Sequence, residues 1–441
     1  MPMFSSFGGG MHPPEHKSAT KDLKFINLAI PHSCYLSLQQ HAGAPAKPVV
    51  SKGDTISEGQ RIGIAQGFVS AHVHSSIPGK VADVADILTI YGTRQAVIVE
   101  TEGAFTASAH PSQPVDWESL AGGEITERIN DAGIVDLGGA AFPTLVKLSP
   151  SAEKRIDTLI INGTEWEPYL TTDDMLMKTY PDAVIEGCRI TMKALGVASA
   201  IIGVEDNKRD SYKALSKSLA AMNPPENISI KKLKTKYPQG AEKQLISSLL
   251  RREFPSGSLP GDTGGIVQNV GTVYAIREAV VFGRPLIMRH ITVSGGAIAR
   301  PGNYKVRIGM RISDIVDECG GFKRQPAKIV MGGPMCGISV HSMDIPVVKG
   351  TSGVLFLTGE EVSFRDYSPC IRCGKCVTVC PVGLLPCDLG NAVEKERLDI
   401  AAGLNPFDCI MCGSCSYVCP AKRPLSHFFK IAQEKIQVVR E

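Results

Sequence analysis

Eight cysteines near the C-terminus repeat one spacing twice. The first run is Cys370-x2-Cys373-x2-Cys376-x3-Cys380-Pro381, and the second is Cys409-x2-Cys412-x2-Cys415-x3-Cys419-Pro420. Three thiolates separated by two residues wrap one [4Fe–4S] cluster on a tight loop, while the fourth, turned by proline, reaches the other cluster. The spacing therefore predicts two clusters with crossed ligation. One would be held by Cys370, Cys373, Cys376 and Cys419, and the other by Cys409, Cys412, Cys415 and Cys380.

A structural zinc site is the alternative interpretation, because paired CxxC motifs also bind zinc. Zinc takes four ligands and gives no reason for a third cysteine at the same spacing, followed by x3-Cys-Pro, in duplicate. The other cysteines stand outside both runs, and Cys387 is predicted to be a buried thiol. Small core residues are predicted at Cys34, Cys188, Cys319 and Cys336.

The length of 441 residues predicts two to four domains. The net charge of +3 does not indicate nucleic-acid binding. No apolar run reaches the roughly 18 residues that would indicate a membrane span. The opening Met1–Lys17 segment has glycines and prolines where a signal peptide needs an apolar stretch. The protein is therefore expected to stay in the cytoplasm.

The first module is predicted to be a β-rich half-barrel over residues 23–105, after an N-terminal extension over residues 1–22. Short β-rich runs alternate there with Gly-Asp, Glu-Gly and Pro-Gly turns. The pattern resembles the half-barrel of biotinyl and lipoyl carriers. Those carriers need a lysine at a hairpin tip, and the stretch Gly63–Ser75 has none, so the module is interpreted as a scaffold without a swinging arm.

Residues 118–288 show alternating strand and helix patterns. Apolar strands are predicted at Thr158–Ile161, Ala198–Val204 and Ile228–Leu233. Helices are predicted at Asp182–Leu195, Asn207–Ala221 and Ala241–Arg251. This alternation predicts a Rossmann-like α/β domain with a largely parallel sheet, whose ligands bind beyond the carboxyl ends of the strands.

Two further modules complete the chain. Residues 289–360 return to strand character with one helix near Ile312–Cys319, which fits a small β-grasp-like module. Residues 361–441 are loop and helix around the cysteines, ending in an amphipathic helix at Ser426–Val439. The fold class is therefore multidomain, with β and α/β modules followed by a helical two-cluster domain.

Two polar segments of the α/β domain are candidate ligand contacts. Gly138 and Gly139 would let main-chain N–H groups approach a phosphate, with Lys147 supplying charge. Asn162, Glu165 and Glu167 follow a predicted buried strand, where such a sheet presents ligands. From spacing alone, the first segment is also compatible with a simple turn and the second with a polar loop.

Taken together, these motifs resemble the RnfC family, which supplies one subunit of the Rnf complex, a bacterial ferredoxin:NAD oxidoreductase that couples electron flow to ion pumping. The resemblance covers essentially the full chain, including the half-barrel and both cysteine runs. The other ordered motifs that carry it are GGGMHPP at 8–14, GGAAFPT at 138–144, NGTEWEPYLT at 162–171 and GGPM at 332–335.

The middle of the chain also looks like the flavin-bearing, NADH-binding subunit of respiratory complex I. This resemblance implies non-covalent FMN on the α/β domain with NADH stacked over it. It places Gly138, Gly139 and Lys147 at the flavin phosphate. It implies that Asn162 lines the flavin and nicotinamide pocket together with the catalytic candidates Glu165 and Glu167. The remaining cofactor-binding residues implied are Tyr237, Gly240 and Glu242 of a Tyr-x-x-Gly-x-Glu motif, and Asn269 and Thr272 of an Asn-Val-x-Thr motif.

The sequence departs from these families at three positions. Trp166 stands where relatives usually have cysteine, Thr164 replaces an acid, and Ala241 replaces the first of two paired glutamates. The departures concern the contacts of flavin and nicotinamide and leave the cysteine module untouched.

The block near Ser294–Gly333 looks like the soluble-ligand-binding (SLBB) β-grasp that both families share.

These resemblances imply an electron-input subunit that moves electrons between NAD(H), FMN and two [4Fe–4S] clusters. The expected partners are other subunits of the complex, including membrane-embedded ones, with ferredoxin acting indirectly. The expected place is the cytoplasmic side of the bacterial inner membrane. Two rival hypotheses are a cobalamin reductase that shares the flavin core and clusters, and a wiring subunit with clusters but an empty nucleotide pocket.

Overall fold

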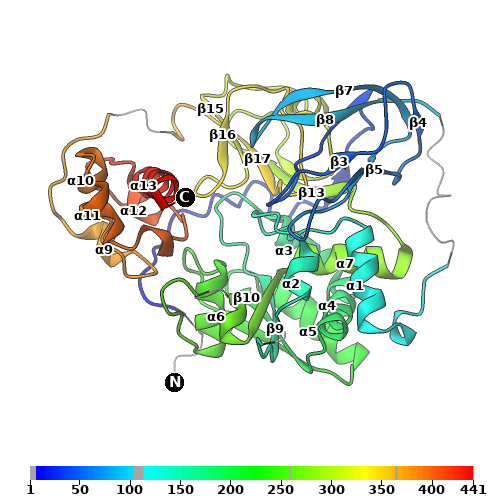
Figure 1. The fold of residues 1–441 in the computed structure, drawn as a ribbon, viewed down its shortest axis with the longest axis horizontal. Helices are drawn as coiled ribbons and strands as arrows, with labels where there is room; N and C mark the ends of the chain where they lie inside the picture. Colours follow the sequence, from blue (N-terminus) through cyan, green and yellow to red (C-terminus); the bar gives the residue numbers. More distant parts are fainter. Residues whose placement is uncertain (1–5, 104–112, 152, 259, 363–365, 441) are drawn as a thin grey trace.

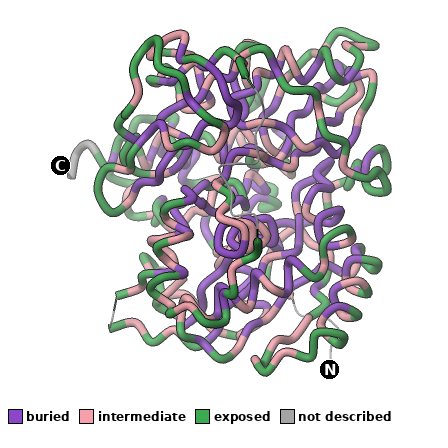
Figure 2. Tube along the Cα trace, turned by 90° about the vertical axis from the view of Figure 1, so that its right-hand side faces the viewer, coloured by how far each residue is buried: buried purple, intermediate pink, exposed green. Residues whose placement is uncertain are grey.

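The structure is a computed structural model that describes residues 6–103, 113–151, 153–258, 260–362 and 366–440. The predicted start at residue 1, the predicted end of the half-barrel at residue 105 and the predicted end of the last domain at residue 441 lie outside these ranges. Figure 1 shows the half-barrel beside the β-grasp module, the α/β domain below both, and the helical cysteine module on one flank. Buried residues form continuous stretches through the interior of each layer (Figure 2).

The half-barrel consists of two small antiparallel sheets. Strand order is β2-β8-β7-β4 in one sheet and β3-β5-β6 in the other. The strands are β2 (Ser33–Ser37), β3 (Lys47–Pro48), β4 (Thr55–Ile56), β5 (Arg61–Ile64), β6 (Val73–His74), β7 (Gly79–Thr89) and β8 (Gly92–Thr101). Alternate residues face inward, since Cys34 and Leu36 of β2 are fully buried while Ser33 and Tyr35 are half-buried. The predicted half-barrel is confirmed.

The α/β domain has a four-stranded parallel sheet in the order β11-β10-β9-β12. The strands are β9 (Thr158–Gly163), β10 (Ser199–Glu205), β11 (Asn227–Leu233) and β12 (Gly265–Asn269). The helices are η2 (Trp117–Ser119), α1 (Gly122–Asp131), α2 (Thr144–Leu148), α3 (Thr172–Thr179), α4 (Pro181–Leu195), α5 (Arg209–Met222), α6 (Glu242–Leu250), η3 (Pro260–Thr263) and α7 (Val270–Phe282). Local sequence sets the ends of α4, which begins at Pro181 and stops at Gly196 in a left-handed conformation. The order of the four strands is the Rossmann-like arrangement that the sequence predicts.

The β-grasp module is a six-stranded sheet in the order β1-β14-β13-β17-β15-β16, with one helix packed on it. Its elements are β1 (Phe25–Asn27), β13 (Met288–Ser294), β14 (Gly302–Arg307), α8 (Ile312–Glu318), β15 (Lys328–Met331), β16 (Ile338–Val340) and β17 (Gly353–Leu357). Strand β1 pairs in parallel with β14, so a strand from the segment assigned by sequence to the half-barrel forms an edge of this sheet.

The cysteine module is built of short helices around a small apolar core. They are α9 (Lys375–Thr378), α10 (Pro386–Glu394), α11 (Leu398–Ala402), η4 (Pro406–Asp408), α12 (Ser414–Tyr417) and α13 (Leu425–Arg440). The core contains Leu389 of α10 and Phe429 and Ala432 of α13, all almost fully buried. Helix α13 matches the helix predicted at Ser426–Val439.

The N-terminal segment ties this module to the α/β domain. The Gly10 N–H donates to the Val379 carbonyl at 2.9 Å, and Met11 pairs with Tyr237 through two main-chain hydrogen bonds. Gly9 has φ +67°, and a Cβ there would lie 2.5 Å from the Cys380 carbonyl oxygen, so only glycine fits this crossing. The GGGMHPP motif therefore has a packing role beside Cys380.

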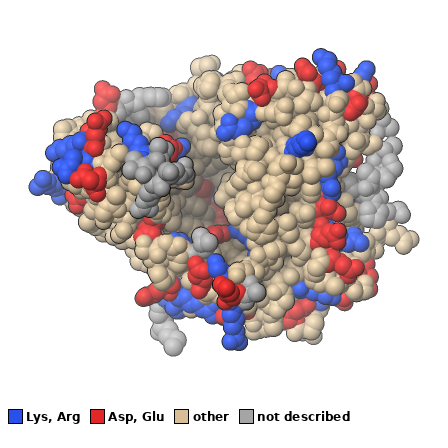
Figure 3. Space-filling model, viewed as in Figure 1, with Lys and Arg blue, Asp and Glu red and all other residues tan. Residues whose placement is uncertain are grey.

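The surface view in Figure 3 shows lysine and arginine mixed with acidic residues on this face, and a hollow beside the cysteine module. Among the described residues, no helix has both the length and the apolar character needed to cross a membrane.

Candidate functional site

The candidate site lies at the switch point of the parallel sheet. Strand β9 has β10 on one side and β12 on the other, and the chain leaves both β9 and β12 at the same edge. Asn162 occurs near the end of β9 and Asn269 at the end of β12, paired in register. Ligands of open α/β sheets bind outside the carboxyl ends of the strands at such a point.

A cavity of about 370 Å³ opens at this edge. The α/β domain, the β-grasp module and Tyr91 of the half-barrel contribute to its wall. Residues lining it include Tyr91, Gly138, Gly139, Asn162, Glu165, Trp166, Glu167, Asp173, Asn269, Gly332, Gly333, Cys336 and Gly350. The volume falls in the range of small-molecule sites, roughly 300–1,000 Å³.

The Gly138–Gly139 turn exposes main chain to this cavity. Gly139 has φ +117°, and no atom lies within 4 Å of the position that a Cβ would take. The Gly138 N–H donates to Asp136 Oδ1 at 3.1 Å. Among the described residues, the N–H groups of Gly139 and Ala140 donate to no protein acceptor. These two free donors beside a cavity can bind an anionic group such as a phosphate.

The ammonium group of Lys147 is held behind this turn. It pairs with Asp136, donates to Glu242 Oε1, and donates to the Val267 carbonyl at 3.0 Å. Burial acts to lower the pKa of Lys147, but the two carboxylates outweigh it and raise the pKa above its usual value. In this arrangement Lys147 organises the glycine turn through Asp136 and does not line the cavity.

Glu165 holds the first turn of α3. Its carboxylate accepts the N–H groups of Asp173 at 2.6 Å and Asp174 at 3.3 Å, and lies 3.7 Å from Lys17 Nζ. Lys17 also donates to the carbonyls of Glu165 and Leu170. Burial raises the pKa of the Glu165 carboxyl, and the lysine opposes this shift. One face of Glu165 lines the cavity while its oxygens position α3.

Glu167 holds a loop of the β-grasp module against the cavity. It accepts the N–H groups of Met335 at 3.1 Å and Cys336 at 2.9 Å. Burial raises the pKa of Glu167 to about 7, and the two N–H donors oppose that rise. A Cβ on Gly333 would lie 2.2 Å from a Glu167 oxygen, so the Gly332–Gly333 pair permits this close approach.

Asn162 and Asn269 brace the sheet edge. Asn162 Nδ2 donates to the Gly240 carbonyl at 2.8 Å, and Asn269 Nδ2 donates to Asp173 at 2.7 Å. Asn269 Oδ1 also accepts the N–H of Gly271, which caps α7. Burial raises the pKa of Asp173 above its usual range. The amides therefore fix the positions of the loops that form the cavity.

The cysteines gather into two groups in the crossed pattern that the spacing predicts. Cys370, Cys373, Cys376 and Cys419 line one small cavity together with Cys387. Cys380 interacts electrostatically with Cys409, Cys412 and Cys415, and the neighbouring thiols help to raise the pKa of Cys409 and Cys415 beyond the effect of burial. Within the described residues no group of three or more His, Cys, Asp or Glu meets the spacing for a single metal ion.

The donors around the thiols suit sulfur ligands of a cluster. The N–H of Arg372 points to Cys370 Sγ at 3.4 Å, that of Met411 to Cys409 Sγ at 3.4 Å, and that of Leu384 to Cys380 Sγ at 3.3 Å. Such N–H···S contacts stabilise thiolate ligands and tune cluster potential. Four thiols with main-chain donors around each site fit [4Fe–4S] clusters.

The second cysteine group adjoins the cavity. The Tyr237 hydroxyl donates to the Cys412 carbonyl at 2.6 Å and lies 3.4 Å from Cys336 Sγ. Cys336 lines the cavity and contacts the Met411 carbonyl at 3.7 Å. One loop residue thus touches both the cavity and the Cys409–Cys415 loop.

Comparison with known families accounts for each module in order. Residues 5–104 match the RnfC Barrel sandwich hybrid domain, and residues 129–278 match the Nuo51 FMN-binding domain. Residues 290–339 match the SLBB domain, and residues 363–420 match the 4Fe-4S dicluster domain. The cofactors of these modules are FMN and two [4Fe–4S] clusters.

Full-length relatives agree with this order. The chain is 43% identical over 432 residues to the C subunit of the Na⁺-translocating ferredoxin:NAD⁺ oxidoreductase complex of Acetobacterium woodii, covering 98% of this chain and 97% of the relative. The chain belongs to the RnfC family. It is also 44% identical over 395 residues to the proton-translocating counterpart of Clostridium ljungdahlii, covering 89% and 86% of the two chains. The C subunit of the ion-translocating oxidoreductase complex of Rhodobacter capsulatus is 39% identical over 434 residues, covering 98% and 83%.

A solved structure shows the same fold. A chain of an NAD⁺-reducing [NiFe]-hydrogenase in the air-oxidised state superimposes with a TM-score of 0.50 and 21% identity, covering 70% of this RnfC-family chain and 63% of the hydrogenase chain. At this level of identity the likeness concerns the fold alone.

The structure brings together about half of the cofactor residues that the sequence implies. Gly138, Gly139, Asn162, Asn269, Glu165 and Glu167 line the cavity. The other five, in the described structure, lie outside its wall: Lys147, Tyr237, Gly240, Glu242 and Thr272. The Thr272 hydroxyl accepts the N–H of Leu137 and donates to Asp136. The Gly240 carbonyl accepts a hydrogen bond from the Asn162 amide, and the Tyr237 hydroxyl donates to the Cys412 carbonyl. Their roles at FMN and NAD(H) stay predictions.

Several residues of the site were not identified from sequence. Asp173, Tyr91 and Cys336 line the cavity, and Lys17 holds Glu165 from the N-terminal segment. The prediction of Cys336 as a small core residue is wrong, since it is exposed beside the cavity; Cys387 is half-buried rather than buried. For Cys336, its place directly after the GGPM motif was a usable signal. Cys34, Cys188 and Cys319 are buried as predicted.

Proposed function

We propose that this RnfC-family chain passes electrons between NAD(H) and the membrane-embedded subunits of an ion-translocating ferredoxin:NAD⁺ oxidoreductase complex. It would act as a peripheral subunit on the cytoplasmic side of the membrane, with ferredoxin reached through other subunits. The names of the relatives support the reaction and the membership of a complex. The cavity supports a site for FMN and nicotinamide on this chain.

One observation carries the proposal. The loop directly after the GGPM motif lies between the cavity and the second cysteine group. In this loop, Cys336 lines the cavity and contacts the Met411 carbonyl of the Cys409–Cys415 loop. FMN, when bound, links a two-electron hydride donor to one-electron carriers. The group of Cys380, Cys409, Cys412 and Cys415 therefore holds the cluster nearer the cavity, and the group with Cys370 holds the distal one.

The chain's own residues would bind and orient the ligands in four ways. The Gly139 and Ala140 N–H groups would receive the flavin phosphate. Asn162 and Asn269 fix the two strand ends beneath the ring site. Glu165 orders the first turn of α3, and the β-grasp loop, held by Glu167, closes one wall and excludes water.

The test uses the full chain, purified anaerobically with its clusters complete and reconstituted with FMN. Bound flavin near one per chain together with NADH-dependent reduction of an artificial acceptor supports the proposal. Complete clusters with neither flavin nor activity would favour the wiring-subunit hypothesis. Replacing Gly139 with valine puts a branched side chain into the cavity at a positive φ and should remove flavin while iron content stays unchanged.

A further inference from the structure

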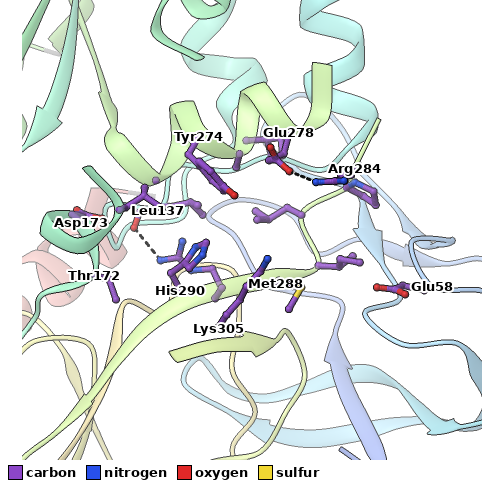
Figure 4. A pocket seen from close by; sticks show the side chains of 18 residues that line it. Glu58, Leu137, Thr172, Asp173, Tyr274, Glu278, Arg284, Met288, His290 and Lys305 are labelled. Atoms are coloured by element: carbon purple, nitrogen blue, oxygen red, sulfur yellow. Dashed lines mark hydrogen bonds and ion pairs between the residues drawn. The ribbon is translucent and has the colours of Figure 1, made fainter. Parts of the chain in front are cut away.

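A second cavity adjoins the cavity at the sheet edge, which we call the flavin cavity. It has a volume of about 360 Å³ and is bounded by α7, by β13 and β14 of the β-grasp module, and by Glu58 of the half-barrel. Leu137, Thr172 and Asp173 line both cavities. Figure 4 shows side chains from these separate elements pointing into one space.

Most of the wall of this cavity is apolar. Leu176 of α3, Ala275 of α7 and the segment Leu286–Met288 supply aliphatic surface from three directions. Ala275, Leu286 and Ile287 are themselves buried, so their neighbours fix their positions. A concave, preformed apolar wall with few polar groups is the usual form of a small-molecule site.

One cationic group faces the space without a partner. Among the described residues, the Lys305 ammonium forms no hydrogen bond or ion pair, and Figure 4 shows it directed into the cavity. The acid that acts on it at longer range, Glu278, is already paired with Arg277 and Arg284. Burial lowers the pKa of Lys305. A bound anion would oppose that lowering of the pKa.

The other cations around the cavity are occupied by protein groups. Arg284 pairs with Glu278 at 2.6 Å, and Arg307 pairs with Glu58. Arg289 donates to the Thr351 carbonyl at 2.9 Å. The free positive charge of the wall is therefore concentrated at Lys305.

A second polar atom is also unsatisfied. Nε2 of His290, on β13, is buried without a hydrogen-bond partner among the described residues. Its ring packs edge-on against Tyr274, with 5.7 Å between ring centroids, and at a tilt against Phe25, with 4.4 Å between centroids, and these contacts fix its orientation. Buried polar atoms without a protein partner are uncommon in folded proteins, so this nitrogen, when it carries the ring proton, can donate a hydrogen bond to an acceptor on a ligand in the cavity.

We propose that this cavity binds a small organic acid with an apolar body. The carboxylate would pair with Lys305 and form a hydrogen bond with His290. The apolar body would lie against Leu176, Ala275 and Leu286. A neutral apolar ligand would leave the lysine unpaired, and a highly charged one would meet the aliphatic wall, so a single acid group on an apolar body fits both observations.

The test measures binding of octanoate to the full chain by isothermal titration calorimetry, with octan-1-ol as the uncharged probe. Wild-type protein should bind octanoate once per chain. Lys305→Met keeps the aliphatic stem and removes the charge, and should weaken octanoate binding by about tenfold or more, because a charge-assisted hydrogen bond is lost. Octan-1-ol should bind more weakly than octanoate, and Ala275→Phe should fill the cavity and abolish octanoate binding. Lys328→Met changes an exposed lysine of the same sheet and should leave binding unchanged.

Loss in Lys305→Met and in Ala275→Phe, with binding retained in Lys328→Met, supports the proposal. Octanoate that fails to bind wild-type protein, or binds equally well to Lys305→Met, overturns it. Lys305→Gln provides a second variant if the methionine variant does not fold, and flavin content of each variant reports separately on the flavin cavity.

Discussion

The Tyr237 hydroxyl donates a 2.6 Å hydrogen bond to the carbonyl of Cys412, so a residue of the α/β domain is joined to a cluster-binding loop. Tyr237 is almost fully buried, with Trp166 packed against it at 4.8 Å between ring centroids. The adjoining main chain pairs with Met11 of the N-terminal segment. Three segments far apart in sequence therefore meet at this tyrosine, which joins Cys336, at the cavity wall, to the Cys409–Cys415 loop.

Removing this hydroxyl tests the contact. Tyr237→Phe leaves a buried carbonyl without its donor, which costs about 1–3 kcal/mol, and should lower the apparent melting temperature by a few degrees. Iron content should stay at the wild-type level. Differential scanning calorimetry and stopped-flow bleaching of the clusters after NADH addition provide the measurements. Tyr417→Phe changes a half-exposed tyrosine of the cysteine module and should be neutral; equal melting temperatures for all three proteins would contradict the role given to Tyr237.

Lys147 gives a second prediction. Lys147→Met leaves the buried Asp136 carboxylate without its cation, a change that costs about 3–5 kcal/mol when a buried pair is broken. Because Asp136 also receives the Gly138 N–H, we expect FMN to be lost with the ordered turn. The measurements are flavin content and melting temperature.

The matched control for Lys147 is the double variant Asp136→Asn with Lys147→Met. It removes both charges of the pair and should recover much of the melting temperature. If the double variant binds FMN as well as wild-type protein, the charge of Lys147 is not needed at the flavin phosphate. If flavin is lost while stability recovers, Lys147 also contributes charge to the phosphate.

The sequence predicts the α/β domain well because its signals are local. Predicted strand Thr158–Ile161 is observed as β9, and predicted helix Asp182–Leu195 as α4 with its proline start and glycine end. The cysteine groups follow from spacing for the same reason. Contacts between residues that are far apart in the sequence leave no such local signal. The pairing of β1 with β14, and of Lys147 with Glu242, depends on the completed fold.

The glutamates of the site show the same limit. Sequence places Glu165 and Glu167 at the end of a strand, and both do line the cavity. Their oxygens, however, bind main-chain N–H groups of α3 and of the Met335–Cys336 loop. The acceptor role of Glu167 depends on a loop that is distant in sequence, so no motif in one segment could reveal it.

Glu167 gives a prediction about pH. Burial raises its pKa from 4.5 to about 7, with Lys17 acting in the opposite direction. A carboxyl with a raised pKa in the folded state contributes stability below its unfolded pKa, and that contribution is lost as pH rises from about 4.5 to about 7. The loss is on the order of 3 kcal/mol.

The comparison with Glu167→Gln isolates this group from the others that titrate. The amide cannot ionise, so the variant should lose less stability than wild-type protein as pH rises from about 4.5 through about 7. Its single carbonyl can still accept one of the two N–H groups from Met335 and Cys336. Melting temperatures measured across this range provide the test, and parallel curves for the two proteins would show that Glu167 does not titrate there.

The last prediction concerns crossed ligation of the two clusters. Cys419 lines the cavity of the first run, and Cys380 interacts with the thiols of the second. Wild-type protein should contain about eight iron atoms, and each single variant about four. Cys419→Ser should remove the EPR signal of the cluster held by Cys370, Cys373 and Cys376. Cys380→Ser should remove the signal of the cluster nearer the flavin cavity.

The two variants should differ in function as well as in spectrum. Loss of the nearer cluster should stop the distal cluster from being reduced by NADH, although dithionite still reduces it. Loss of the distal cluster should leave the nearer one reducible by NADH, because Cys336 and Tyr237 still join it to the flavin cavity. Cys387→Ser, a half-buried thiol beside the distal group, should keep both signals. Spectra in which each run loses its own cluster would show that ligation is not crossed.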